Sequence, residues 1–242
     1  MAGTDTPALQ ARRELQDFLD AQLTANAGTR VLDAGCGGAT RIRLPKDAQI
    51  TGIDISAESA GRNTTIPHII IGDVQTYPLP HNAFDVVVCW ELLEHVREPR
   101  AALTRFVGTL RQGGLIVLAI PNPVSLKGLI TKASPHALHV WILRNILKQK
   151  NAGRPGFAPF PTHLSPDIAP SALEQFFHAH GMTVSFLRLY EGKRLSTLRQ
   201  HAPWLYYMYR ACVSALNLVT LKRHDFGASD MLLIAQARPY QA

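Results

Sequence analysis

A glycine-rich turn between two acidic residues is the feature of this chain that most clearly indicates chemistry. The segment 31–39 reads VLDAGCGGA, and Asp54 follows nineteen residues after the first glycine, in a second apolar run, GIDIS. Glycines let the backbone approach a ligand closely, and a carboxylate at the end of a second parallel strand can accept hydrogen bonds from both hydroxyls of a ribose. The pattern predicts a site for a nucleoside-containing cofactor.

The residues around the turn favour a cationic cofactor over a dinucleotide. A dinucleotide site uses a third glycine, and this chain has Thr40 at that place. Asp33, two residues before Gly35, would repel a pyrophosphate but attract an ammonium group. S-adenosylmethionine (SAM) carries an ammonium and a sulfonium and no phosphate, so it fits the turn better than NAD does.

Five motifs follow one another along the chain: VLDAGCGGA at 31–39, GIDIS at 52–56, GDVQTYPLP at 72–80, FDVVVCWELLEHV at 84–96 and LRQGGLIVLAIPNP at 110–123. In this order they resemble the motifs of class I SAM-dependent methyltransferases, in particular the ubiquinone O-methyltransferase type (methyltransferase type 11). The resemblance is strong over 29–122 and weaker at 160–191 and 230–238. It implies an enzyme that transfers a methyl group from SAM to a small, lipophilic or phenolic acceptor, with O-methylation as the expected reaction.

The resemblance also implies roles for individual residues. Gly35 and Gly37 would approach the methionine part of SAM, with Asp33 on its amino group, and Asp54 would hold the ribose hydroxyls. The other implied cofactor residues are Ile55 and Val74 beside the adenine, Asp73 on the adenine amino group and Trp90 near the methyl group. Each acid also has a structural explanation as a helix N-cap, and Trp90 has one as a core residue.

This chain departs from the family pattern around the turn. Ala39 stands where the last glycine of the turn is usual, and the distance from the turn to Asp54 is about two residues shorter than in many relatives. Pro45 further implies that the first helix of the fold is truncated.

The sequence Glu91-Leu92-Leu93-Glu94-His95 has two explanations. In some relatives Glu-x-x-Glu-His and a distant histidine bind a divalent metal, and His163 in PTHLSP resembles that distant ligand. A metal would lower the pKa of an acceptor hydroxyl. Leu-Glu-His-Val also occurs in methyltransferases that bind no metal, and His95 or His163 could then act as general base. The metal ligands therefore stay candidates, and SAM is the one firm cofactor prediction.

Alternating strand-like and helix-like segments predict an α/β fold with a Rossmann-like, mostly parallel sheet and helices on both faces. The resemblance implies seven strands, with the last one antiparallel. The expected strands are 30–34, 49–53, 68–71, 85–89, 115–120, 182–190 and 231–237. The expected helices are 8–24, 99–110, 124–151 and 171–180, with short helical turns after the first and second strands. We expect one methyltransferase domain over 1–242, with the N-terminal helix 8–24 and acceptor-side inserts at 124–170 and 191–229.

Residues 204–221 are apolar except for Arg210, Ser214, Asn217 and Thr220. Their length would permit a membrane span, but the spacing of the first three marks one polar stripe on a helix. The chain must also return to the sheet at Met231, which a span would prevent. We therefore expect this insert to pack over the active site, with a peripheral membrane contact through Trp204, Tyr206, Tyr207 and Tyr209.

The formal charge of +7 leaves the partner open, because the basic residues are scattered through 97–112, 127–154 and 188–223 without a dense run. A small-molecule acceptor is favoured over nucleic acid. Three widely spaced cysteines and a start without an apolar core predict a cytoplasmic protein, peripheral to a membrane if the insert touches one. The alternatives are an RNA or protein methyltransferase and a non-catalytic scaffold of the same fold. The sequence carries no motif for the acceptor or for the oligomeric state.

Overall fold

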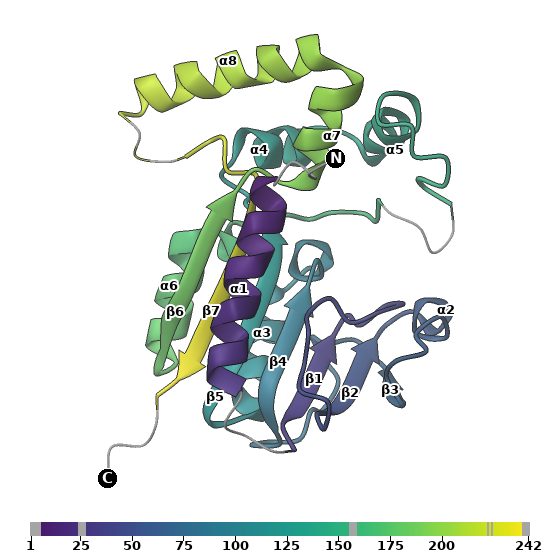
Figure 1. The fold of residues 1–242 in the computed structure, drawn as a ribbon, viewed down its shortest axis with the longest axis vertical. Helices are drawn as coiled ribbons and strands as arrows, with labels where there is room; N and C mark the ends of the chain where they lie inside the picture. The colour runs from purple at the N-terminus through teal and green to yellow at the C-terminus, as the bar shows by residue number, and fades with distance from the viewer. Residues whose placement is uncertain (1–5, 24–27, 155–158, 222, 224, 239–242) are drawn as a thin grey trace.

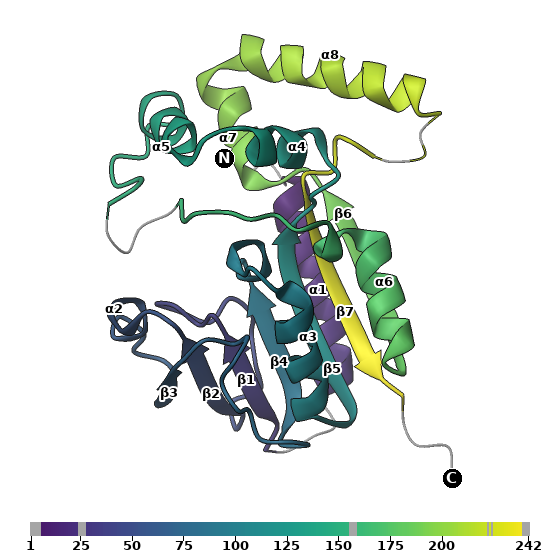
Figure 2. The same ribbon diagram turned by 180° about the vertical axis from the view of Figure 1, so that it is seen from behind.

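Seven strands form one sheet at the centre of the computed structural model, which describes residues 6–23, 28–154, 159–221, 223 and 225–238 (Figures 1 and 2). The strand order is β3-β2-β1-β4-β5-β7-β6. β7 runs antiparallel to both β5 and β6, whereas β1 to β5 pair in parallel. The strands are β1 Arg30–Ala34, β2 Gln49–Asp54, β3 His68–Ile71, β4 Phe84–Trp90, β5 Leu110–Pro121, β6 Met182–Tyr190 and β7 Asp230–Ala237. The predicted Rossmann-like sheet is confirmed.

Helices cover both faces of the sheet. Helix α1, Pro7–Leu23, lies on one face, and α3, Pro99–Thr109, and α6, Pro170–Ala179, lie on the other (Figures 1 and 2). Because side chains alternate along a strand, β4 feeds two cores: Val86 and Val88 join the leucines of α1, and Val87 joins those of α3 and α6. A buried central strand of this kind is hydrophobic at nearly every position.

The connection from β1 to β2 contains no helix, so the expected turn of helix after the first strand is wrong. Residues 35–48 form turns and irregular backbone. Glycines disfavour a helix at the start of this short connection, and Pro45 lacks the N–H that a helix interior needs. Ile42 and Leu44 instead pack against the core beneath α1. The short helix after the second strand does form, as α2, Ala57–Ala60, and Ser56 caps it by accepting from the Ser59 N–H.

Two further boundaries differ from the prediction. β5 begins at Leu110, directly after α3, five residues earlier than expected, and its register with β4 shifts between Phe84 and Val86. The expected helix over 124–151 is two helices, α4 Leu126–Ala133 and α5 His136–Asn145, since Pro135 interrupts the hydrogen bonding between them.

Beyond the carboxyl ends of the parallel strands lies a layer that we call the cap, made of α4, α5, α7 Lys193–His201 and α8 Pro203–Val219 (Figures 1 and 2). Its two inserts are joined where they leave the sheet. The buried Asn122 amide donates to the Ala228 carbonyl (2.9 Å), and Lys127 Nζ donates to Asp230 Oδ2 (2.7 Å). No helix in the described part of the chain is long and apolar enough to cross a bilayer.

Candidate functional site

The glycine turn follows β1 and adopts a backbone that favours glycine. Gly35 has φ +70° and Gly37 has φ +46°. The Gly35 N–H donates to the Ile53 carbonyl at 2.7 Å, which holds the turn against β2. A Cβ on Gly35 would lie 3.0 Å from the side chain of Leu92, so the turn also packs closely on the segment after β4. Gly35 is therefore required both by its backbone conformation and by this contact.

The carboxylate of Asp54 joins the turn to the next element. Its Oδ2 accepts from the Gly37 N–H (2.9 Å) and its Oδ1 accepts from the Ser56 N–H (2.8 Å). A carboxylate oxygen can accept more than one hydrogen bond, so Asp54 keeps the capacity to accept from the hydroxyls of a ligand. Its half-buried place at the end of β2 suits the ribose role.

Asp33 is buried without a full set of partners. Its residue is 3% exposed, and among the described residues no group hydrogen-bonds its Oδ2 atom. Burial raises the pKa of this carboxyl to about 6. A buried, unpaired carboxylate is costly, so the position fits a cationic group such as the ammonium of SAM.

The three residues predicted to lie beside the adenine differ in how exposed their side chains are. Ile55 is 71% exposed and offers a free apolar surface, whereas Val74 is 5% exposed and is part of the main core. The Gln75 amide donates to both carboxylate oxygens of Asp73, at 3.0 and 2.9 Å. Asp73 begins a turn rather than a helix. The contact between Gln75 and Asp73 was not predicted, although both residues lie in the GDVQ motif.

Trp90 ends β4 with its ring buried on the α1 face. It is 7% exposed, and the guanidinium of Arg12 lies 4.9 Å from its ring centroid. The side chain is thus a core residue, and the role near the methyl group stays a prediction for its backbone. The next residue, Glu91, is exposed and has φ +51°, which is uncommon outside glycine. Arg12 was missed by the sequence analysis because nothing in α1 marks it.

His95 and His163 lie near one another, after the carboxyl end of β4. His95 is the last residue of the 3₁₀ turn Leu93–His95, and the backbone of His163 contacts this turn. His95 Nδ1 lies 2.7 Å from the Pro161 carbonyl, and the Glu94 carbonyl accepts from the His163 N–H at 2.8 Å. Burial lowers the pKa of His95 below its ordinary value, whereas His163 is exposed. The segment around His163 therefore contacts Glu94 through its backbone rather than through an imidazole.

The four candidate metal ligands do not form a metal site. Within the described residues, which include Glu91, Glu94, His95 and His163, no three His, Cys, Asp or Glu side chains are grouped to hold an ion. Glu94 is buried, no partner for its Oε2 occurs in the described structure, and burial raises the pKa of its carboxyl to about 8. Burial therefore disfavours the ionised form of this carboxyl in the described structure.

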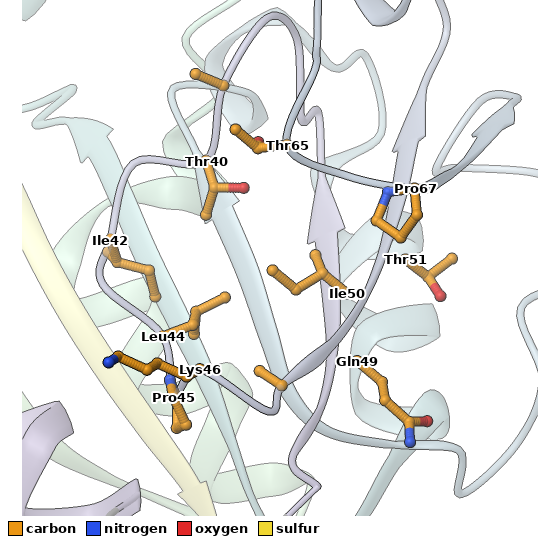
Figure 3. Close-up of a pocket in the computed structure, with 12 residues that line it drawn as sticks. Thr40, Ile42, Leu44, Pro45, Lys46, Gln49, Ile50, Thr51, Thr65 and Pro67 are labelled. Atoms are coloured by element: carbon orange, nitrogen blue, oxygen red, sulfur yellow. The ribbon is translucent and has the colours of Figure 1, made fainter.

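A cavity of about 680 Å³ adjoins the glycine turn on the side where the first helix is absent (Figure 3). Ile42 and Leu44 from the connecting loop and Ile50 from β2 face this space. Its walls include Ala39 and Thr40 but none of the three acids Asp33, Asp54 and Asp73. The cavity is a neighbour of the proposed cofactor site and not the site itself.

Comparison with known proteins agrees with this geometry. A family model described as a methyltransferase domain matches residues 8–185. The ubiquinone biosynthesis O-methyltransferase of Psychrobacter cryohalolentis is 35% identical over 119 residues, which cover 43% of this chain and 46% of that protein. The 27-O-demethylrifamycin SV methyltransferase of Amycolatopsis mediterranei is 30% identical over 134 residues, 49% of each chain. The chain therefore spans about half the length of these curated relatives.

The fold is found in solved structures as well. A SAM-dependent methyltransferase from Archaeoglobus fulgidus superposes with a TM-score of 0.51 at 18% identity, covering 93% of this chain and 94% of that one. At this identity the likeness concerns the fold alone. The match of the family model over most of the chain, with the five motifs and the seven-stranded sheet, shows that the chain belongs to the methyltransferase-domain family of class I SAM-dependent methyltransferases.

Proposed function

We propose that this chain transfers a methyl group from SAM to an oxygen atom of a small, lipophilic or phenolic acceptor. The observation that carries the cofactor half is the buried Asp33 carboxylate, whose Oδ2 has no partner among the described residues, beside a glycine turn in the left-handed conformation. When bound, SAM supplies a methyl group that its sulfonium already activates. The task of the protein is then mainly to hold and align the two reactants.

Asp33 and Asp54 are the residues that would hold the cofactor in this proposal. Asp33 would pair with the ammonium, and Asp54 would accept from the ribose while its carboxylate keeps the glycine turn in place. Ile55, exposed at the same edge of the sheet, would cover the adenine. The rest of the predicted set, Gly35, Gly37, Asp73, Val74 and Trp90, would shape the site mainly through backbone and packing.

His95 is the better supported general base of the two histidines. Its Nδ1 lies at hydrogen-bonding distance from the Pro161 carbonyl, which can only accept, so Nδ1 carries the proton and Nε2 is left with a lone pair. The lowered pKa of His95 keeps this ring neutral at pH 7. A neutral imidazole can remove the proton of a phenol or hydroxyl as the oxygen attacks.

The cap and two relatives support the proposed acceptor class. Trp141 of α5 is an exposed aromatic residue of the cap, and Phe160, in the loop that follows α5, packs edge-on against His95 with 5.8 Å between the ring centroids. One relative is named as an O-methyltransferase of ubiquinone biosynthesis and the other as a methyltransferase of 27-O-demethylrifamycin SV, and both names refer to small-molecule acceptors. Both support an oxygen on a lipophilic acceptor over RNA or protein.

The test is a methyl-transfer assay with labelled SAM across phenols, quinols and lipids, with RNA and protein included as competing substrate classes. We expect calorimetric SAM binding by the full chain and label transfer to at least one phenol or quinol. Transfer to RNA or protein alone would contradict the proposed small-molecule acceptor and would assign the enzyme to that class of macromolecule. SAM binding without transfer to any class would favour the scaffold alternative, and an absence of SAM binding would refute the proposal entirely.

Asp33 gives a pH-dependent prediction. Its pKa in the folded protein, about 6, lies above the ordinary 3.8, so the folded state binds the proton more tightly than the unfolded state does. The free energy of unfolding of the ligand-free protein should therefore fall as pH rises from about 4 through 6, by at most about 3 kcal/mol from this group. SAM affinity should rise over the same interval, because the ionised carboxylate binds the ammonium.

The measurement compares the wild type with Asp33→Asn by denaturant unfolding and calorimetry at a series of pH values. The asparagine variant should lack this component of the pH slope and should bind SAM weakly at every pH. Identical pH slopes for the two proteins would show that Asp33 is not the group responsible.

A further inference from the structure

Helix α8 turns an apolar face away from the protein. It is the outermost element of the cap, with α4 and α7 between it and the sheet (Figures 1 and 2). Trp204 is 65% exposed, Leu218 is 76% exposed and Val219 is 80% exposed. Exposed apolar residues recur at intervals of four and three along the helix, which places them on one side. This outer stripe consists of Trp204, Met208, Ala211, Ala215 and Leu218, flanked by Tyr207 and Val219.

Two polar residues of α8, Arg210 and Asn217, are bonded to the rest of the protein beside this stripe. Arg210 Nη1 lies 3.4 Å from Glu191 Oε2, and Asn217 Oδ1 accepts from the Phe226 N–H at 3.2 Å. The hydroxyl of Tyr206 donates to the same Glu191 carboxylate at 3.0 Å, and its ring is buried. The solvent-exposed side of α8 is therefore mainly apolar, whereas an ordinary surface helix turns a polar face to the solvent.

Two of the four aromatic residues that we expected to touch a membrane are not exposed enough to do so. Trp204 and Tyr207 are exposed, but Tyr206 is buried and Tyr209 is half-buried. The contact surface is formed by the aliphatic end of α8, around Leu218, as much as by the aromatic end.

The net positive charge of the chain is concentrated in the two segments that contain the cap helices, 124–166 and 192–224. Segments 124–166 and 192–224 contain no Asp or Glu, whereas the rest of the chain carries all 18 acids and 13 of the 25 Lys and Arg. The basic residues of the two segments are Lys127, Lys132, Arg144, Lys148, Lys150 and Arg154, and Lys193, Arg194, Arg199, Arg210, Lys222 and Arg223. The cap sequence is thus strongly positive, and the remainder has an excess of negative charge.

We propose that the cap binds the surface of an anionic lipid bilayer, with the outer stripe of α8 inserted among the acyl chains and the exposed basic residues, such as Lys132, Lys148 and Lys150, attracted to the headgroups. Amphipathic helices of this type lie in the plane of the interface, and their binding combines apolar burial with attraction to anionic lipids. RNA would match the charge but would leave Leu218 and Val219 without an apolar partner. A second copy would match the stripe but would bring two positive caps together.

The charge distribution also fixes the orientation. The negative remainder of the chain is repelled by the surface that attracts the cap, so the carboxyl ends of the strands face the bilayer. The proposal concerns binding alone and does not depend on methyl transfer.

The experiment is vesicle co-sedimentation of the full chain, with phosphatidylcholine vesicles and with vesicles that also contain phosphatidylglycerol. The test variant is Leu218→Glu with Val219→Glu, at two positions whose exposure leaves the fold intact. The matched control is Leu187→Glu, since Leu187 is an exposed leucine on the edge strand β6 of the sheet, outside the cap. Thermal unfolding and SAM binding verify that each variant is folded.

We expect the wild type to bind the anionic vesicles, to bind the neutral vesicles far more weakly and to be released by high salt. The double variant should bind at least roughly tenfold more weakly, and the Leu187 variant should match the wild type. Equal binding by the double variant and the wild type would overturn the proposal, as would equal binding to neutral and anionic vesicles.

Two further measurements test whether RNA or a second copy of the chain, rather than a bilayer, binds the outer stripe of α8. Binding to a mixed-sequence RNA oligonucleotide, without binding to vesicles, would assign the surface to nucleic acid. A dimer in light scattering that the double variant dissociates, again without vesicle binding, would assign it to a second copy. Either result would overturn the bilayer proposal.

Discussion

Replacing His95 with glutamine is expected to lower kcat about 100-fold, which is within the range for loss of a general base. Glutamine keeps a similar length and can still donate to the Pro161 carbonyl, but it lacks a basic nitrogen. The KM for SAM should change less than about twofold, because His95 makes no contact that positions the cofactor in the proposal. Steady-state kinetics with an acceptor identified in the methyl-transfer assay provide the measurement.

The matched control is His163→Gln, which changes an exposed histidine whose contact with Glu94 is made by its backbone. That variant should retain most of the wild-type kcat. Because burial lowers the pKa of His95, the wild-type rate should begin to fall with acid only below pH 6.5, the ordinary value for histidine. A His95→Gln enzyme with more than about a third of the wild-type kcat would exclude the general base role, since base catalysis contributes far more.

Replacing Asp54 with alanine should weaken SAM binding at least about 100-fold, which corresponds to about 2.7 kcal/mol. The carboxylate would be lost as an acceptor for the ribose hydroxyls, and the N–H groups of Gly37 and Ser56 would lose the partner that fixes the turn. Hydrogen bonds to a charged group contribute about 1.5–3 kcal/mol each, so two such losses account for the effect. Isothermal calorimetry gives the affinities directly.

A matched control is available at the opposite end of the sheet. Asp47 also accepts a backbone N–H, from Gly28 at 2.7 Å, and its removal in Asp47→Ala should leave SAM affinity unchanged. Asp54→Asn should be intermediate, because an amide keeps only one accepting oxygen. SAM affinity within about threefold of wild type in Asp54→Ala would exclude Asp54 from the cofactor site, because it corresponds to less than one such hydrogen bond.

The sheet could be predicted because each of its strands is marked locally. Apolar runs that end at Asp33 and at Asp54 gave β1 and β2 almost to the residue, and their pairing places Asp33 beside Gly52. Both acids therefore lie at the carboxyl edge, as parallel strands require. The connection between them could not be predicted, because a proline in a short loop weakens a helix without showing what replaces it.

The orientation of α8 could not be predicted from the sequence, for a different reason. The spacing of Arg210 and Asn217 shows one polar stripe, and the usual rule would turn this stripe toward the solvent. Its partners, Glu191 and the N–H of Phe226, lie outside the helix and become neighbours only in the fold. For the same reason the sequence placed His163 near Glu94 but could not show that the backbone makes the contact.

The joint at which the two inserts leave the sheet has an evolutionary consequence. Lys127 belongs to the first insert and pairs with Asp230, the first residue of β7, and the same carboxylate accepts from the hydroxyl of Ser229, which ends the second insert about a hundred residues later in the chain. Exchange of either insert alone would remove one of these two partners of the Asp230 carboxylate, at a cost of roughly 1–3 kcal/mol. The two inserts are therefore under pressure to diverge together, and a lineage that changes its acceptor is expected to replace them as a pair.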